Sequence, residues 1–154
     1  MQNLIHSFKY RGKYEIGMML GEMFAADLKS SAYFKNINTI IPVPLHWTKL
    51  KTRGFNQSEV IARGMAKQMN AQIENDVLIR RFATDTQTKK SRLKRVENVQ
   101  GKFGIQNPEK IAGKHVLLID DIITTGSTIE ECANILLSVD ETKVSIASIG
   151  FASK

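Results

Sequence analysis

The chain has 154 residues, of which 42% are hydrophobic and 24% charged, proportions that are ordinary for a globular protein. Its 22 Lys and Arg residues outnumber 15 Asp and Glu, which favours polyanionic ligands such as nucleic acid, phosphorylated metabolites or an anionic membrane surface. A single cysteine, Cys132, excludes an internal disulfide and a cysteine-based zinc site, and no apolar run is long enough to cross a membrane. We therefore expect a cytoplasmic protein that does not enter a membrane.

The first half of the chain predicts two helices and one strand. Apolar residues recur at helical spacing from 14 to 30 and again from 56 to 69. Between these helices, residues 37–43 predict a strand, which the prolines at 42 and 44 end because they cannot donate to a sheet ladder. The segment 44–54 is basic, contains a glycine and predicts a loop.

The second half predicts further strands and one helix. Residues 77–82 and 103–105 are short strand candidates, whereas residues 115–119 are nearly all apolar, as expected for a strand covered on both faces. A helix at 127–139 and a last strand at 144–151 follow. Strands that alternate with helices predict an α/β fold with a central, mainly parallel sheet flanked by helices.

Two carboxylates and a hydroxyl-rich loop follow the strand 115–119. Asp120 and Asp121 come first, and the loop then brings four hydroxyl side chains and a glycine before the expected helix: Thr124, Thr125, Gly126, Ser127 and Thr128. The N–H groups at a helix start attract phosphate, glycine permits close backbone approach, and hydroxyls add donors. Because ligands bind at the carboxyl ends of strands in open α/β sheets, we predict a phosphate-binding loop here.

The two acids suit a different part of the ligand. Carboxylates repel phosphate, but they accept hydrogen bonds from neutral hydroxyls and can help to hold Mg²⁺. A ligand that carries a phosphate at one end and a diol a short distance away is a ribose 5-phosphate. Two simpler interpretations are that the acids form a solvated turn, or that the pairs Ser127–Glu130 and Thr128–Glu131 are capping boxes.

Residues 116–128 resemble the signature of the type I phosphoribosyltransferase family, in which an apolar strand, two acids and a Thr/Ser/Gly loop follow one another. The family's Rossmann-like fold is thereby implied, and so is its substrate, 5-phosphoribosyl-1-pyrophosphate (PRPP). The resemblance also implies that Asp120 and Asp121 hold the ribose 2′ and 3′ hydroxyls, while Thr124 through Thr128 cradle the 5′-phosphate.

Further stretches are similar to one branch of this family, the ComF-like competence proteins. The matching residues are 41–46, 51–58, 80–81, 86–88, Arg92, Arg95 and 101–103, preceded by an opening helix around 4–12. Members of this branch often carry an amino-terminal cysteine-rich zinc module, which this chain lacks. It also contains no glutaminase portion, so a glutamine-dependent amidotransferase is not expected.

The basic segment after the first strand is the expected pyrophosphate side. Arg53 is the preferred ligand, because a guanidinium binds phosphate oxygens in bidentate fashion. Lys51 and His46 are further candidates. The simpler interpretations are a solvated Arg53, a packed or exposed histidine, and helix capping by Asn56 or Ser58.

The polar stretch 83–98 lacks a periodic apolar face and predicts a flexible loop. The resemblance implies that it closes as a lid over the reacting carbon, with Thr86, Gln87 and Lys89 as its candidate residues. Its many Lys and Arg residues can instead contact single-stranded DNA, although stacking aromatics are scarce there. A solvated basic loop is the simplest interpretation.

Together these features predict one α/β domain over residues 1–154 with a helical amino-terminal segment at 1–32. The expected reaction is displacement of pyrophosphate from C1 of PRPP by a nitrogen nucleophile, with Mg²⁺ held through PRPP and Asp120 or Asp121 as a further contact. The sequence identifies neither the acceptor nor the oligomeric state, and a homodimer is compatible with it. The alternatives are a catalytically inactive accessory protein in DNA uptake and a nucleic-acid-binding protein.

Overall fold

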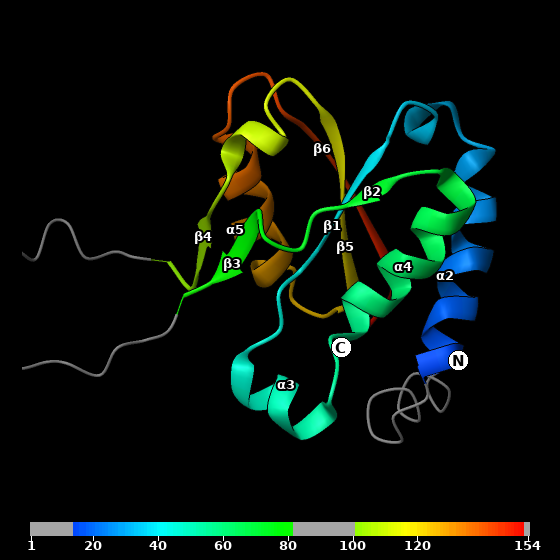
Figure 1. Ribbon diagram of the computed structural model, residues 1–154, viewed down its shortest axis with the longest axis horizontal. Helices are drawn as coiled ribbons and strands as arrows, with labels where there is room; N and C mark the ends of the chain where they lie inside the picture. Colours follow the sequence, from blue (N-terminus) through cyan, green and yellow to red (C-terminus); the bar gives the residue numbers. More distant parts are fainter. Residues whose placement is uncertain (1–13, 82–100, 153–154) are drawn as a thin grey trace, which may run out of the picture.

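The structure is a computed structural model that describes residues 14–81 and 101–152 (Figure 1). Both helices and strands occur along these residues, as the sequence predicts. In chain order the elements are α2 (Tyr14–Lys29), η1 (Ala32–Phe34), β1 (Thr39–Pro42), α3 (Trp47–Arg53), α4 (Gln57–Met69), β2 (Gln72–Ile73), β3 (Leu78–Arg80), β4 (Phe103–Ile105), η3 (Pro108–Lys110), β5 (His115–Ile123), α5 (Ser127–Leu137) and β6 (Lys143–Phe151). Among them is no helix long and apolar enough to cross a membrane.

Four of the strands form a parallel sheet in the order β2-β1-β5-β6. Helices α2 and α4 cover one face of this sheet and α5 covers the other (Figure 1). The predicted α/β fold with a central parallel sheet is therefore confirmed. All four strands end at the same edge of the sheet, which we call the carboxyl edge.

The core is divided between the two faces of β5, whose buried side chains alternate. Val116 and Leu118 pack in the cluster that contains Cys132 of α5, whereas Leu117 and Ile119 pack against residues of α2 and α4. This explains the apolar run in the sequence, since a strand covered on both faces needs apolar residues at every position. Cys132 is fully buried, as expected, and burial raises the pKa of its thiol to about 12.

Strands β3 and β4 form a separate antiparallel pair, in which Leu78 lies opposite Ile105 and Arg80 opposite Phe103. The strand expected at 77–82 is therefore shorter and does not join the parallel sheet. The loop predicted at 83–98 connects the two strands. It lies outside the described residues together with its candidates Thr86, Gln87 and Lys89, so the lid stays a prediction.

The basic segment 44–54 is not a loop throughout, as the sequence had suggested, because it contains the helix α3. His46 begins this helix by accepting a bond from the N–H of Thr48, and Gly54 ends it with a positive φ of 84°. Seven residues are too few for an apolar period to emerge, so the two capping residues define the helix.

Strand β5 does not end at Ile119, where the sequence predicted its end, but continues to Ile123. Strand β6 supplies the partners for this extension, since Asp120 pairs with Ser148 and Ile122 with Gly150. The two acids thus belong to a strand and not to a solvated turn.

Helices α2 and α4 approach each other at two glycines. A Cβ atom added at Gly21 would collide with the carbonyl oxygen of Ile61, and one at Gly64 with the carbonyl oxygen of Met18. At the start of the two helices the rings of Tyr14 and Phe55 meet edge to face, with centroids 6.1 Å apart. The two helices therefore begin side by side, at the carboxyl edge of the sheet (Figure 1).

Candidate functional site

The predicted site residues gather at the carboxyl edge, where β1 and β5 end side by side. The N–H of Val43, just past β1, donates to the carbonyl of Ile119 over 2.9 Å. The loop after β1 consequently lies next to Asp120 and Asp121. Ligands of open α/β sheets bind at this position, so the topology agrees with the sequence-based placement of the site.

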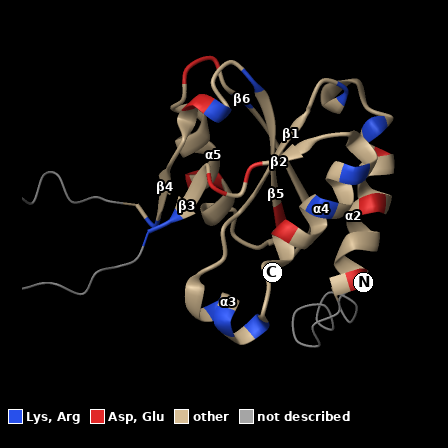
Figure 2. Cartoon of the chain, viewed as in Figure 1, with Lys and Arg blue, Asp and Glu red and all other residues tan. Residues whose placement is uncertain are grey.

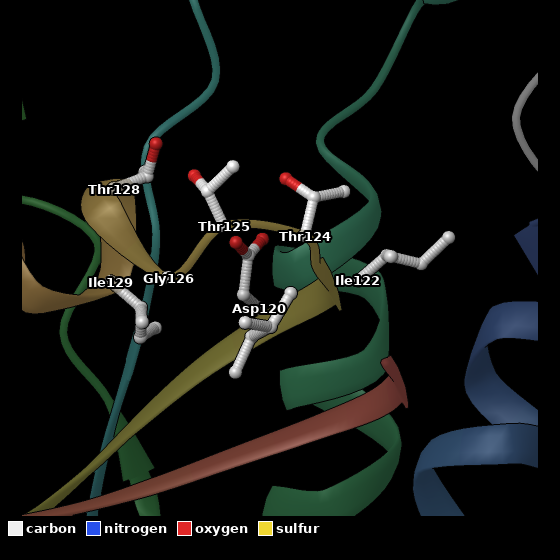
Figure 3. Close-up of a pocket in the computed structure, with 8 residues that line it drawn as sticks. Asp120, Ile122, Thr124, Thr125, Gly126, Thr128 and Ile129 are labelled. Carbon is white, nitrogen blue, oxygen red and sulfur yellow. The ribbon is translucent and has the colours of Figure 1, made fainter. Parts of the chain in front are cut away.

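The hydroxyl-rich loop lines a small hollow of about 50 Å³ (Figure 3). The carboxylate of Asp120 points toward Thr125 across this hollow. Its lining consists of Asp120, Ile122, Ile123, Thr124, Thr125, Gly126, Thr128 and Ile129. Five of the seven residues predicted for the phosphate and the diol thus share one hollow whose size suits a single phosphate group.

The start of α5 carries no side-chain cap. Gly126 occupies the N-cap position with φ 83°, and its carbonyl accepts the first helical bond, from the N–H of Glu130. The hydroxyl of Ser127 bonds instead to the hydroxyl of Thr125 at 3.0 Å, and Glu131 accepts from the N–H of Phe103. The alternative of two capping boxes is therefore wrong, and the helix start remains suited to an anion.

Gly126→Ala is expected to weaken phosphate binding through its backbone. A positive φ is strained for alanine, which costs about 1–2 kcal/mol, and relief of that strain would turn the loop away from the phosphate. Gly113→Ala is the matched control, because Gly113 has φ 70° and, like Gly126, nothing within 4 Å of an added Cβ. Urea unfolding should show similar losses of stability for the two variants, whereas calorimetry with inorganic phosphate should show weaker binding only for Gly126→Ala. Weaker binding in both variants would contradict a role for this loop.

The carboxylate of Asp120 is held by two donors. Its Oδ1 accepts from the hydroxyl of Ser58 at 3.0 Å and from the N–H of Asp121 at 2.9 Å. Burial of the carboxyl, followed by repulsion from Asp121, raises the pKa of Asp120 from 3.8 to about 6. Sequence reasoning considered Ser58 only as a helix cap, because nothing in the sequence places a helix start against an acid 62 positions later.

Asp121 is tied to its own strand and to β6. Its Oδ1 accepts from the N–H of Ile122 at 2.8 Å, and its carbonyl accepts from the hydroxyl of Ser148 at 3.3 Å. Within the described ranges no group of three or more His, Cys, Asp or Glu side chains could hold a metal ion. Two carboxylates alone can therefore contribute only part of the oxygen shell of a cation such as Mg²⁺.

The three pyrophosphate candidates lie on α3 or at its start. His46 uses Nδ1 to accept from the N–H of Thr48 at 3.3 Å, and Lys51 is exposed on the helix. Arg53 donates from Nη1 to Oε1 of Gln57 at 3.0 Å, so its guanidinium lies against the start of α4 and is not fully solvated. Figure 2 marks in blue the Lys and Arg positions of α3 and those at the end of β3.

A second and larger hollow of about 430 Å³ lies between α3 and β3. Sequence reasoning did not predict it, because it joins segments that are far apart in the chain. Trp47 is 51% exposed at this hollow, and the guanidinium of Arg80 stacks over the ring of Phe103 at 5.1 Å. The lining residues are Pro44, Leu45, His46, Trp47, Leu50, Asn75, Leu78, Ile79, Arg80, Arg81 and Gln106.

The profile of the phosphoribosyl transferase domain matches residues 56–152, more than half of the chain. The chain belongs to the phosphoribosyl transferase domain family. The matched range of this phosphoribosyl transferase domain includes the start of α4, both acids and the whole hydroxyl-rich loop. The resemblance carried by residues 116–128 is therefore confirmed.

Curated relatives of this phosphoribosyl transferase domain are DNA utilization and competence proteins. It is 31% identical to DNA utilization protein YhgH of Shigella flexneri, over 87% of this chain and 60% of that protein. It is 30% identical to Competence protein F of Haemophilus influenzae, over 92% of this chain and 64% of that protein. The chain spans about three fifths of the length of the curated relatives it matches, and the expected ComF-like resemblance is confirmed.

Among solved structures, the phosphoribosyl transferase domain is similar to the glutamine phosphoribosylpyrophosphate amidotransferase of B. subtilis, complexed with ADP and GMP. The TM-score is 0.61 at 24% identity, and the match covers 86% of this chain and 26% of that chain. A likeness at this level of identity shows the fold, so the predicted type I phosphoribosyltransferase fold is confirmed.

Proposed function

We propose that this protein binds PRPP at the carboxyl edge and transfers its phosphoribosyl group to a nitrogen nucleophile. The observation that carries the proposal is the hollow in which the carboxylate of Asp120 faces the uncapped start of α5. An anion-attracting helix start beside a hydroxyl-accepting carboxylate matches the phosphate and the diol of a ribose 5-phosphate. Membership of the phosphoribosyl transferase domain family supports the same ligand.

In the proposed reaction the bond between C1 and the pyrophosphate oxygen breaks, and a bond between the nucleophile and C1 forms. The pyrophosphate leaves with both electrons of the broken bond, and the nucleophile gives up its proton to solvent. Thr124 through Thr128 hold the 5′-phosphate, Asp120 and Asp121 hold the ribose hydroxyls, and Arg53, with Lys51 and His46, balances the charge of the leaving pyrophosphate. Catalysis then comes from positioning and charge stabilisation, without a covalent protein nucleophile.

Mg²⁺ fits this site only as a partner of the substrate. The described residues offer two neighbouring carboxylates and no third acidic or imidazole ligand, so phosphate and hydroxyl oxygens of PRPP with water complete the shell. The cation supplies neutralisation of the pyrophosphate charge. Asp120 or Asp121 would contact the cation or its water.

PRPP with Mg²⁺ is expected to raise the melting temperature more than ribose 5-phosphate does, because only PRPP also occupies the pyrophosphate side. Thermal unfolding with each ligand at equal concentration measures this difference. Equal shifts for the two ligands would contradict the proposed binding of pyrophosphate by this protein. A screen for pyrophosphate release across amine and nucleobase acceptors then tests for chemistry, and Asp120→Asn, which binds PRPP more weakly, should release less pyrophosphate at limiting PRPP.

Two other functions remain as candidates. The relatives are DNA utilization and competence proteins, which favours an accessory role in DNA uptake, for which PRPP would bind without turnover. The exposed Trp47, with Arg80 and Arg81 at the end of β3, favours contact with single-stranded nucleic acid, since stacking and phosphate neutralisation are the two sources of such affinity. Salt-sensitive binding of single strands without PRPP binding would support this last function against the first two.

A further inference from the structure

Ser58 is a buried hydroxyl next to the ribose acids. It is the second residue of α4, its exposed fraction is 3%, and its Oγ donates to Oδ1 of Asp120 over 3.0 Å. The same oxygen accepts from the N–H of Asp121. Donors from a helix on one side and from the strand on the other therefore hold one oxygen of the carboxylate.

A ring of hydrogen bonds holds Ser58 itself. Asn56 accepts on Oδ1 from the N–H of Ser58 at 3.2 Å and donates from Nδ2 to the carbonyl of Val43 at 3.0 Å. The N–H of Val43 donates to the carbonyl of Ile119, the residue before Asp120. These bonds close a ring through the end of β1, the start of α4 and strand β5.

We propose that Ser58 is a positioning residue that orients the carboxylate of Asp120 toward the ribose diol. Asn56 assists it by tying the start of α4 to the loop after β1. The inference rests on the proposed function, because it concerns the residue that orients the ribose-binding carboxylate of Asp120. A carboxylate fixed by two donors loses little further freedom when the ligand arrives, so the ring increases affinity by preorganisation.

The contacts separate this role from helix capping. Asn56, and not Ser58, supplies the side-chain oxygen that caps α4, and it caps the backbone N–H of Ser58. Ser58→Ala keeps that N–H and removes only the hydroxyl, so α4 should persist. Ser58→Thr keeps a hydroxyl and serves as the conservative variant.

The test is the affinity of each variant for two probes, ribose 5-phosphate and inorganic phosphate, by calorimetry. Ser58→Ala should lose about three- to tenfold in affinity for ribose 5-phosphate and nothing for inorganic phosphate, which has no diol. Ser58→Thr should recover most of the loss. In an Asp120→Ala background, Ser58→Ala should have no further effect. Equal losses for both probes, or a further loss in that background, would overturn the proposal.

A second measurement needs no ligand. The N–H of Asp121 donates to the oxygen that Ser58 holds, so its amide resonance reports the orientation of the Asp120 carboxylate. Ser58→Ala should shift this resonance in the free protein, and Ser58→Thr should largely restore it. If the unsubstituted protein binds neither ribose 5-phosphate nor PRPP, the proposed function fails, whereas an unmoved Asp121 resonance in Ser58→Ala overturns the positioning role.

Discussion

Asp120→Asn and Asp121→Asn are each expected to weaken PRPP binding about ten- to a hundredfold, because hydrogen bonds to a charged partner contribute roughly 1.5–3 kcal/mol. Both substitutions keep nearly the same shape. In Asp120→Asn the new amide oxygen would still accept the bonds from Ser58 and from the N–H of Asp121. The loss should therefore reflect the charge that faces the ribose hydroxyls and not a damaged fold.

Inorganic phosphate is the control ligand for these two variants. It has no diol and is repelled by carboxylates, so its affinity should be unchanged or slightly higher after either substitution. Calorimetric titration of each variant with PRPP and with phosphate gives both numbers. Unchanged PRPP affinity in both variants would mean that the acids do not touch the ribose, and the phosphoribosyl assignment would lose its main physical support.

Asp120→Asn should also make the free protein more stable at neutral pH, by about 3 kcal/mol, since each pKa unit corresponds to about 1.4 kcal/mol. The pKa of Asp120 is raised to about 6 in the folded protein, whereas an unfolded aspartate ionises near 3.8. The folded state therefore holds this proton more tightly than the unfolded state does. As the pH rises from about 4 to about 6, the wild-type protein should lose stability, and above that range the loss should stay constant.

Urea unfolding of the wild type and the variant across this pH range measures the effect. The two proteins should have equal free energies of unfolding at about pH 4, where the carboxyl of Asp120 is neutral in the folded state. The difference between their free energies of unfolding should grow as the pH rises. Asp76 provides a control of opposite sign, because the bond from Lys110 lowers the pKa of Asp76. Asp76→Asn should never be more stable than the wild type at neutral pH. An Asp120→Asn variant that is less stable than the wild type at neutral pH would refute this account.

The central strand, the two long helices and the phosphate loop could be predicted from the sequence because their signals are local. The apolar run at 115–119 and the helical spacing at 14–30 and 56–69 are properties of contiguous residues. The loop from Thr124 to Thr128 was also recognisable, since its residue types and their order carry its chemistry. These features needed no knowledge of what lies nearby in space.

Features that depend on distant partners could not be predicted. The extension of β5 through Asp120 relies on pairing with β6, because aspartate has a low intrinsic propensity for strands. The separation of β3 from the main sheet depends on its pairing with β4. The contact between Ser58 and Asp120 joins residues 62 positions apart. A serine at a helix start is common, so nothing near Ser58 in the sequence indicated this contact.

Chimaeras that exchange α2 between relatives face a strict steric condition. The backbones of α2 and α4 touch at Gly21 and Gly64, so an incoming helix with any side chain at position 21 must move outward. Such a shift would draw Tyr14 away from Phe55, which immediately precedes the ring residue Asn56. An exchange of α2 would then alter ribose affinity, and glycine at both contact positions is the minimum requirement for a graft that leaves the site unchanged.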